Sequence, residues 1–151
     1  MGSISIDAGM SAAKSPSVRF GDLTVNGFIN ESTGVANFLN IQFARIPARF
    51  AQAELINPQN EVGTVDATSY GPRCPQPYDK FHERTAYLYE EMSTDCPQSE
   101  FQCLNLNIYT PPRQSDSTRK IPVVVWIHGG AYTYGDNGCE YGALGEIICS
   151  T

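Results

Sequence analysis

The feature that most constrains the fold is the stretch at residues 121–135, which reads IPVVVWIHGGAYTYG. Its five residues from Val123 to Ile127 are all β-branched or aromatic, and none carries a charge. A run that is apolar on both faces is typical of a strand in the middle of a sheet covered on both sides. The sequence therefore predicts a central buried strand over residues 121–127 that runs directly into a glycine turn.

The glycine turn has the composition of an anion-binding loop. Gly129 and Gly130 tolerate positive φ and let a ligand approach the backbone closely. When successive N–H groups converge on the oxygen of a tetrahedral intermediate, one donor stabilises the transition state by about 3 kcal/mol. A tight turn without chemistry is the alternative. The buried run, His128 and Gly135 together favour an oxyanion hole, the pattern found in esterases and lipases.

The partners of such a turn are missing from the sequence. A serine nucleophile should sit on a G-x-S-x-G elbow, and no serine here has glycine at both flanking positions. The nearest approach is Ser11, with Ala13 in place of the second glycine, in a polar segment interpreted as a linker. His82 is interpreted as a solvated loop residue and His128 as part of the turn. We therefore predict no catalytic nucleophile, acid or base on this chain, although composition leaves a Cys-His site open.

Composition excludes several classes of partner. The chain has 41% hydrophobic residues, enough for one globular domain, and a net charge of −6 without a basic patch. That balance argues against nucleic-acid binding. No run of about 18 apolar residues exists, so we predict no membrane span. Two histidines without ligand spacing predict no metal and no cofactor.

Two further expectations concern the compartment and the thiols. The first residues contain no apolar core of signal-peptide length, so the default expectation is a cytoplasmic protein. The odd count of 5 cysteines without an export signal favours mostly free thiols, although a secreted relative could carry a bridge.

The rest of the chain reads as strands and loops. We expect a flexible arm over residues 1–17, and then a hairpin with its turn at Asn26-Gly27. A second strand should follow over residues 35–47. Residues 51–100 are rich in proline and contain one candidate helix at 85–92. The helices that should cover the central strand are therefore mostly absent from the pattern.

A last strand is predicted just before the apolar run. Leu104, Leu106 and Ile108 alternate with polar or amphipathic residues, and two prolines follow. This period of two predicts a strand whose apolar face is buried.

Four blocks, in order, resemble the type-B carboxylesterases, a family that includes fungal esterase/lipases and the cholinesterases. The blocks are FLNIQFARIPARF at 38–50, YGPRCPQ at 70–76, SEFQCLNLNIYTP at 99–111 and PVVVWIHGGAYTYG at 122–135. The resemblance covers roughly residues 18–141. It implies an α/β fold, the N-terminal part of an α/β-hydrolase: antiparallel strands plus the first central strands of the sheet, incomplete and with few helices.

The resemblance assigns roles to the turn residues. Gly130 and Ala131 match the two N–H donors of the family's oxyanion hole, and Gly129 shapes the turn. Ala131 stands where many relatives have a third glycine, and alanine keeps the backbone N–H. Tyr132 matches an aromatic residue that lines the gorge on the acyl-pocket side.

The resemblance also assigns two structural pairs. Cys74 and Cys103 match the family's first disulfide, which closes a loop beside the gorge. Arg49 and Glu100 match a pair that forms a structural salt bridge in relatives.

The functional expectation is a fragment of a carboxylic ester hydrolase. In the family the nucleophile, acid and catalytic histidine lie downstream, so this chain resembles only the N-terminal portion and is expected to be inactive alone. We divide it into the arm at 1–17, the carboxylesterase portion at 18–141 and a divergent tail at 142–151, for which truncation or mis-splicing is the leading explanation. The intact family acts on esters. A non-catalytic interaction module derived from the same fold is the main alternative, and an unrelated Cys-His enzyme is a third.

Overall fold

The structure is a computed structural model that describes residues 15–77, 97–111, 121–138 and 149. The regular elements within these residues are short strands and one turn of 3-10 helix. The predicted helix at 85–92, most of the arm at 1–17 and most of the tail at 142–151 lie outside the described residues.

One sheet is built around a tight N-terminal hairpin. Strand β1 (Ser17–Phe20) pairs antiparallel with β2 (Asp22–Asn26), and β2 pairs in parallel with β7 (Val62–Asp66). The 3-10 helix η1 (Pro58–Asn60) precedes β7, and the Asn57 side chain caps it by accepting from the Gln59 N–H. A proline at the start of this turn fits because its missing N–H is not needed there.

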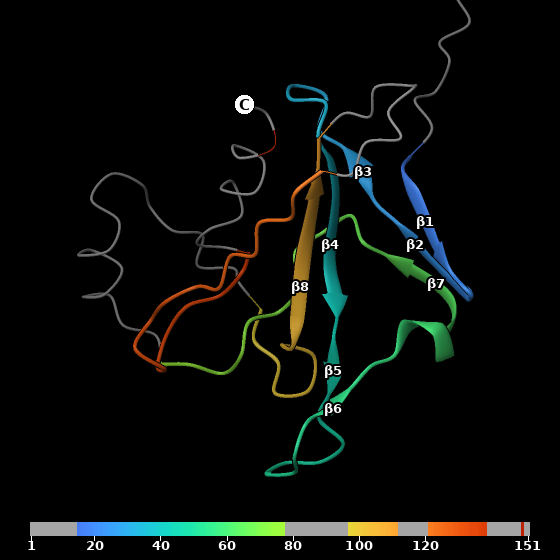
Figure 1. Cartoon of the computed structure of the whole chain (residues 1–151). Coiled ribbons are helices and arrows are strands. Elements are labelled where there is room, and N and C mark those ends of the chain that lie inside the picture. The colour runs from blue at the N-terminus through green and yellow to red at the C-terminus, as the bar shows by residue number, and fades with distance from the viewer. Residues whose placement is uncertain (1–14, 78–96, 112–120, 139–148, 150–151) are drawn as a thin grey trace, which may run out of the picture.

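A second sheet lies at the centre of the molecule. It contains β3 (Phe28–Ile29), β4 (Ala36–Gln42) and β8 (Asn105–Thr110), all paired antiparallel. Figure 1 shows β4 and β8 side by side, with the first sheet on one side of them. A bulge interrupts the pairing after Phe38, where Asn40 adopts a φ of 56° and donates its N–H to the Asn107 side chain at 3.0 Å. A bulge of this kind bends the strand locally and increases its twist.

A two-stranded sheet continues from the end of β4. It pairs β5 (Ala44–Arg45) with β6 (Glu54–Leu55) and lies at the foot of the molecule in Figure 1. The prediction of a strand over residues 35–47 is thus confirmed, with one break between β4 and β5.

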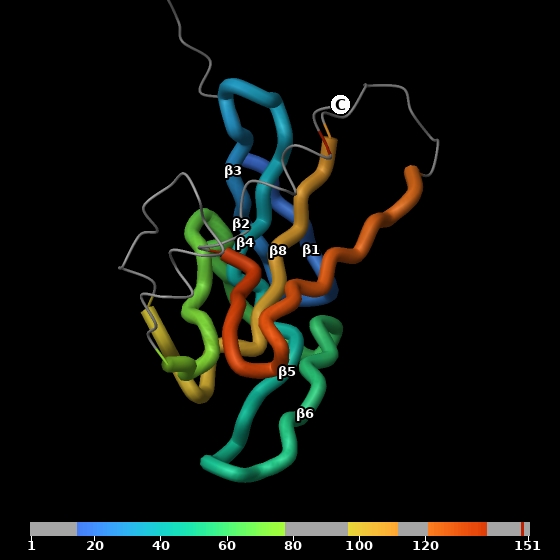
Figure 2. Tube along the Cα trace, turned by 90° about the vertical axis from the view of Figure 1, so that its left-hand side faces the viewer, coloured from blue at the N-terminus to red at the C-terminus, as the bar shows by residue number. Residues whose placement is uncertain are grey.

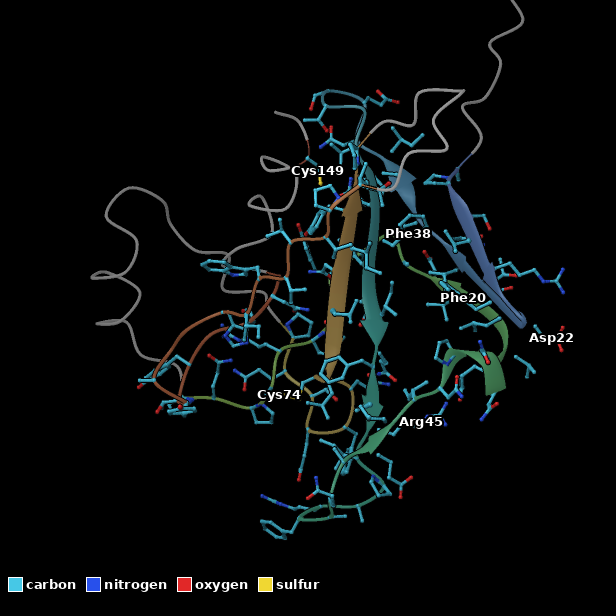
Figure 3. The ribbon with its side chains drawn as sticks, viewed as in Figure 1. Phe20, Asp22, Phe38, Arg45, Cys74 and Cys149 are labelled. Atoms are coloured by element: carbon cyan, nitrogen blue, oxygen red, sulfur yellow. A yellow bond between two sulfur atoms is a disulfide. The ribbon has the colours of Figure 1, made fainter. Side chains whose placement is uncertain are left out.

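The core lies between the two larger sheets. Its buried residues are Val25 of β2, Phe38 of β4 and Ala67, which follows β7. Figure 3 shows Phe38 on the side of β4 that faces β2. The Leu39 N–H donates to the Ala67 carbonyl at 2.9 Å, so backbone pairing as well as packing joins the sheets. Partly buried apolar residues surround this centre: Leu23, Ala36, Ile41 and Val65.

The predicted hairpin turn at Asn26-Gly27 is wrong. Phe20 pairs with Leu23, so the turn is at Gly21, which has a φ of 58°. Gly27 instead lies where the chain passes from β2 to β3, and a Cβ there would stand 2.8 Å from the Phe38 ring. Position 27 therefore needs glycine for close packing against β4, not for a reversal of the chain.

The predicted central strand at 121–127 is also not formed as a strand. These residues pair with no strand among the described residues, and Val123 and Ile127 are 85% and 81% exposed. Figure 2 shows this orange segment standing away from the strands before the chain curls back as the red loop. A β-branched apolar run fits the middle of a sheet, but it becomes a strand only when a neighbour supplies the ladder of hydrogen bonds.

Strand β8 forms as predicted, but its buried face differs from the prediction. Asn105 is 6% exposed, whereas Ile108 is 44% exposed. The asparagines of β8 form hydrogen bonds with Asn137, in the loop that follows the apolar run.

Candidate functional site

The glycine turn has three consecutive residues with positive φ. The angles are 125° at Gly130, 50° at Ala131 and 61° at Tyr132. The Gly130 carbonyl accepts hydrogen bonds from the N–H groups of Thr133 at 2.9 Å and Tyr134 at 3.0 Å. The turn is therefore closed by its own backbone and reverses the chain immediately after His128.

The conformation of this turn is strained. Left-handed backbone costs a residue with a Cβ about 1–2 kcal/mol, and both Ala131 and Tyr132 adopt it. Among the described residues, the N–H groups of Gly130 and Ala131 donate to no acceptor. The Tyr132 side chain is fully exposed. Strain combined with unused donors is the arrangement expected of a functional loop rather than a passive connection.

Two glycines of the turn are required by space. A Cβ on Gly130 would overlap the Tyr134 carbonyl oxygen. A Cβ on Gly135, where φ is 106°, would lie 2.6 Å from both the Gly129 oxygen and His128 Nδ1. His128 Nδ1 is itself 2.8 Å from the Gly129 carbonyl, to which it donates in the matching tautomer. This histidine thus belongs to the turn.

Hydrogen bonds join the residues after the turn to β8 and to the segment at 70–77. Asn107 donates its side-chain N–H to the Asn137 carbonyl at 2.6 Å, and Asn137 donates to the Asn105 carbonyl at 2.8 Å. The Gln76 side chain bonds to both backbone groups of Gly135. Sequence reasoning missed these side chains. The position of Gln76 in the YGPRCPQ block, two residues after Cys74, was the signal available.

The predicted pair Cys74 and Cys103 forms a disulfide, with the two Cα atoms 4.8 Å apart. It joins the segment at 70–77 to the approach to β8, and Cys74 is labelled in Figure 3. Closing a loop with a separation of 29 residues stabilises the folded state by about 3.5 kcal/mol in the chain-entropy model.

The predicted pair Arg49 and Glu100 also lies in contact. Arg49 Nε is 3.5 Å from Glu100 Oε1, but the side chains are 69% and 36% exposed. An exposed pair of this kind contributes roughly 0–1 kcal/mol.

A free thiol lies at the other end of β8. Cys149 donates its S–H to the Tyr109 carbonyl at 3.5 Å, beside the upper end of β8 in Figure 3. Desolvation by burial raises the pKa of this thiol, which favours the neutral form that can donate.

The described residues hold neither a metal-binding cluster nor a long apolar helix. They contain no group of three or more His, Cys, Asp or Glu side chains placed to hold a metal ion. The described part of the chain also has no helix with the length and apolar character that crossing a membrane requires.

Known proteins resemble this chain in both sequence and fold. The family model described as Carboxylesterase family matches residues 14–149. Lipase 3 of Yarrowia lipolytica is 39% identical over 67% of this chain and 20% of its own length. Para-nitrobenzyl esterase of Bacillus subtilis is 34% identical over 78% of this chain and 23% of its own length. Acylcarnitine hydrolase of Mus musculus is 40% identical over 68% of this chain and 18% of its own length.

Solved structures agree with these matches. A thermophilic pNB esterase superposes with a TM-score of 0.55 at 36% identity, over 76% of this chain and 21% of that one. EstA of Aspergillus niger gives a TM-score of 0.54 at 28% identity, over 82% and 21%. The strands thus form the N-terminal part of an α/β-hydrolase fold. The chain belongs to the carboxylesterase family. It spans about a fifth of the length of the curated relatives it matches.

Proposed function

We propose that this chain supplies the oxyanion-binding turn of a carboxylic ester hydrolase. Gly130 and Ala131 would donate their N–H groups to the oxygen of the substrate carbonyl, and Gly129 would give the turn its shape. The observation that carries the proposal is a strained turn with two N–H groups that donate to no acceptor among the described residues. Membership of the carboxylesterase family supports it.

The reaction we propose is acyl transfer. A serine hydroxyl attacks the ester carbonyl while a base removes its proton, and the carbonyl oxygen becomes an anion. The two N–H groups stabilise that anion more strongly than the neutral carbonyl, which lowers the barrier. Collapse expels the alcohol and leaves an acyl-serine, which water then hydrolyses. The names of two relatives, para-nitrobenzyl esterase and acylcarnitine hydrolase, agree with an ester substrate.

The serine, acid and base must come from a further part of the catalytic domain. The sequence has no G-x-S-x-G elbow, and we infer that these 151 residues do not hydrolyse esters alone. The exposure of the apolar run at 121–127 supports the same inference, because such a surface is suited to being covered by further strands and helices.

A chimera tests the proposal. Residues 1–138 are joined to the part of Bacillus subtilis para-nitrobenzyl esterase that follows its matching glycine turn, and hydrolysis of a para-nitrophenyl ester is measured. We expect hydrolysis by the chimera and none by the 151-residue chain. Replacing the Ala131 amide by an ester through semisynthesis, which removes this N–H and keeps the side chain, should lower kcat about 100- to 1000-fold, and Ala131→Gly, which keeps the N–H, should not.

The outcomes separate the two main readings. A folded chimera that binds the ester but does not hydrolyse it would contradict the proposal and favour a non-catalytic binding role. Equal activity of the two Ala131 variants would show that this N–H is not an oxyanion donor.

A further inference from the structure

We propose that two glutamines, Gln98 and Gln76, act in series as positioning residues for the glycine turn. Gln98 holds the backbone of Gln76, and Gln76 holds the backbone of Gly135. This inference rests on the proposed function, because it assigns a role in placing the donors Gly130 and Ala131. Neither glutamine would touch the substrate.

The contact between Gln76 and Gly135 uses both ends of the side-chain amide. Gln76 Oε1 accepts the Gly135 N–H at 2.9 Å, and Gln76 Nε2 donates to the Gly135 carbonyl at 3.1 Å. Nε2 also donates to the Cys74 carbonyl at 3.2 Å. The side chain therefore takes the place of a neighbouring strand for one residue, and both of its donors are used.

Gln98 forms the same kind of paired contact with the backbone of Gln76. Gln98 Oε1 accepts the Gln76 N–H at 3.0 Å, and Gln98 Nε2 lies 3.4 Å from the Gln76 carbonyl, to which it donates. The second glutamine thus fixes the backbone from which the first one reaches, and this limits the positions available to the Gln76 amide.

The backbone segments that carry the two glutamines, called the relay below, are joined by hydrogen bonds and a disulfide. Arg73 donates its N–H to the Pro97 carbonyl at 2.9 Å and accepts from the Ser99 N–H at 3.0 Å, on either side of Gln98. The disulfide from Cys74 joins the same two segments. Both glutamines therefore extend from a cross-linked support.

The position of Gly135 constrains the glycine turn through close packing. Its Cα is packed so closely that an added Cβ would lie 2.6 Å from the Gly129 oxygen. A shift of Gly135 toward the turn would therefore push Gly129, and with it the donors that follow. Misplacement of a reacting group by about 1 Å can cost roughly 100-fold in rate.

The first test uses the full 151-residue chain and needs no catalysis. Hydrogen exchange of the Gly135 amide is followed by NMR, with the Leu39 amide, which bonds to Ala67, as the internal reference. Gln76→Ala should speed exchange at Gly135 at least tenfold and leave Leu39 unchanged. Gln52→Ala, a change at an exposed glutamine outside the relay, should alter neither amide.

Three more variants extend the test, and two of them, Gln98→Ala and Gln76→Glu, keep the relay falsifiable even if Gln76→Ala fails to fold. Gln98→Ala should speed exchange at Gly135 less than Gln76→Ala does. The double variant should match Gln76→Ala alone, because the glutamines act in series. Gln76→Glu keeps the acceptor for the Gly135 N–H but loses the donor at neutral pH, and should give intermediate exchange. Unchanged exchange at Gly135 in folded Gln76→Ala or Gln98→Ala overturns the relay.

A kinetic test links the relay to the turn. In the chimera, Gln76→Ala should lower kcat roughly 10- to 100-fold with little change in KM, and Gln76→Glu should recover part of the loss. If the exchange rates change as expected but kcat does not, the contacts are confirmed and the positioning role is overturned. An inactive parent chimera would instead contradict the proposed function, while the exchange test still decides the relay.

Discussion

Arg73 and Asp136 form a buried ion pair that joins the segment before the disulfide to the loop after the glycine turn. Arg73 Nη1 lies 4.0 Å from Asp136 Oδ2, and the side chains are only 10% and 4% exposed. Asp136 Oδ1 also accepts the Gly138 N–H at 2.7 Å. Arg73 Nε has no hydrogen-bond partner in the described part of the chain. The Asp136 carboxylate therefore compensates the charge of the Arg73 guanidinium.

Asp136→Asn should therefore destabilise the chain strongly. The substitution keeps an oxygen for the Gly138 N–H but leaves the Arg73 charge buried without an anion, at a cost of about 3 kcal/mol. Urea unfolding of both proteins measures the difference. Asp22→Asn is the matched control, because its partner Arg19 and the aspartate are 72% and 79% exposed, and it should cost under about 1 kcal/mol. Similar losses in the two variants would contradict the prediction.

Gly135→Ala should destabilise the chain more than Gly63→Ala. Both positions have nearly the same positive φ, 106° and 107°, so both substitutions carry the conformational cost. At Gly63 an added Cβ meets nothing within 4 Å, whereas at Gly135 it meets two atoms at 2.6 Å. We expect an additional loss of about 1–3 kcal/mol at Gly135, from a comparison of unfolding free energies. Equal losses would mean that the turn can move aside freely.

Cys103→Ser should lower the free energy of unfolding by about 3.5 kcal/mol, because the open chain regains the entropy that the Cys74 link removes. Unfolding is compared with and without a thiol reductant. The reductant should lower the wild-type stability to that of the variant and leave the variant unchanged. An effect of the reductant on Cys103→Ser of similar size would assign the stabilisation to another cysteine.

Val125→Lys should reduce self-association of the isolated chain. Val125 is 77% exposed within an apolar run that has no paired strand among the described residues, and such a segment favours association between chains. Light scattering at increasing concentration measures the effect. Val62→Lys, on a residue of β7 that is 76% exposed, controls for added charge and should have a smaller effect. Equal effects would point to net charge alone.

Strand prediction succeeded where local pattern and tertiary environment agree. Strands β4 and β5 fall inside the segment predicted at 35–47, and β8 falls inside the alternating stretch predicted to end at Pro111. The run at 121–127 failed because its pattern reports only suitability for burial, and the described residues provide no strand to pair with it. The alternation in β8 misled about its buried face, because Asn105 and Asn107 find partners in Asn137 that a sequence cannot reveal.

The sequence by itself determined the family and the position of the glycine turn, because ordered blocks of residues and glycine chemistry are local and readable along the chain. The tertiary structure alone decided what holds the turn. Gln76, Asp136 and Asn137 meet their partners across 59, 63 and 30 to 32 positions. It also decided that Gly27 serves packing and Gly21 the hairpin, since an added Cβ at Gly27 would collide with Phe38 of another strand. Contacts of this kind depend on where distant backbone segments meet, and no local pattern carries that distance.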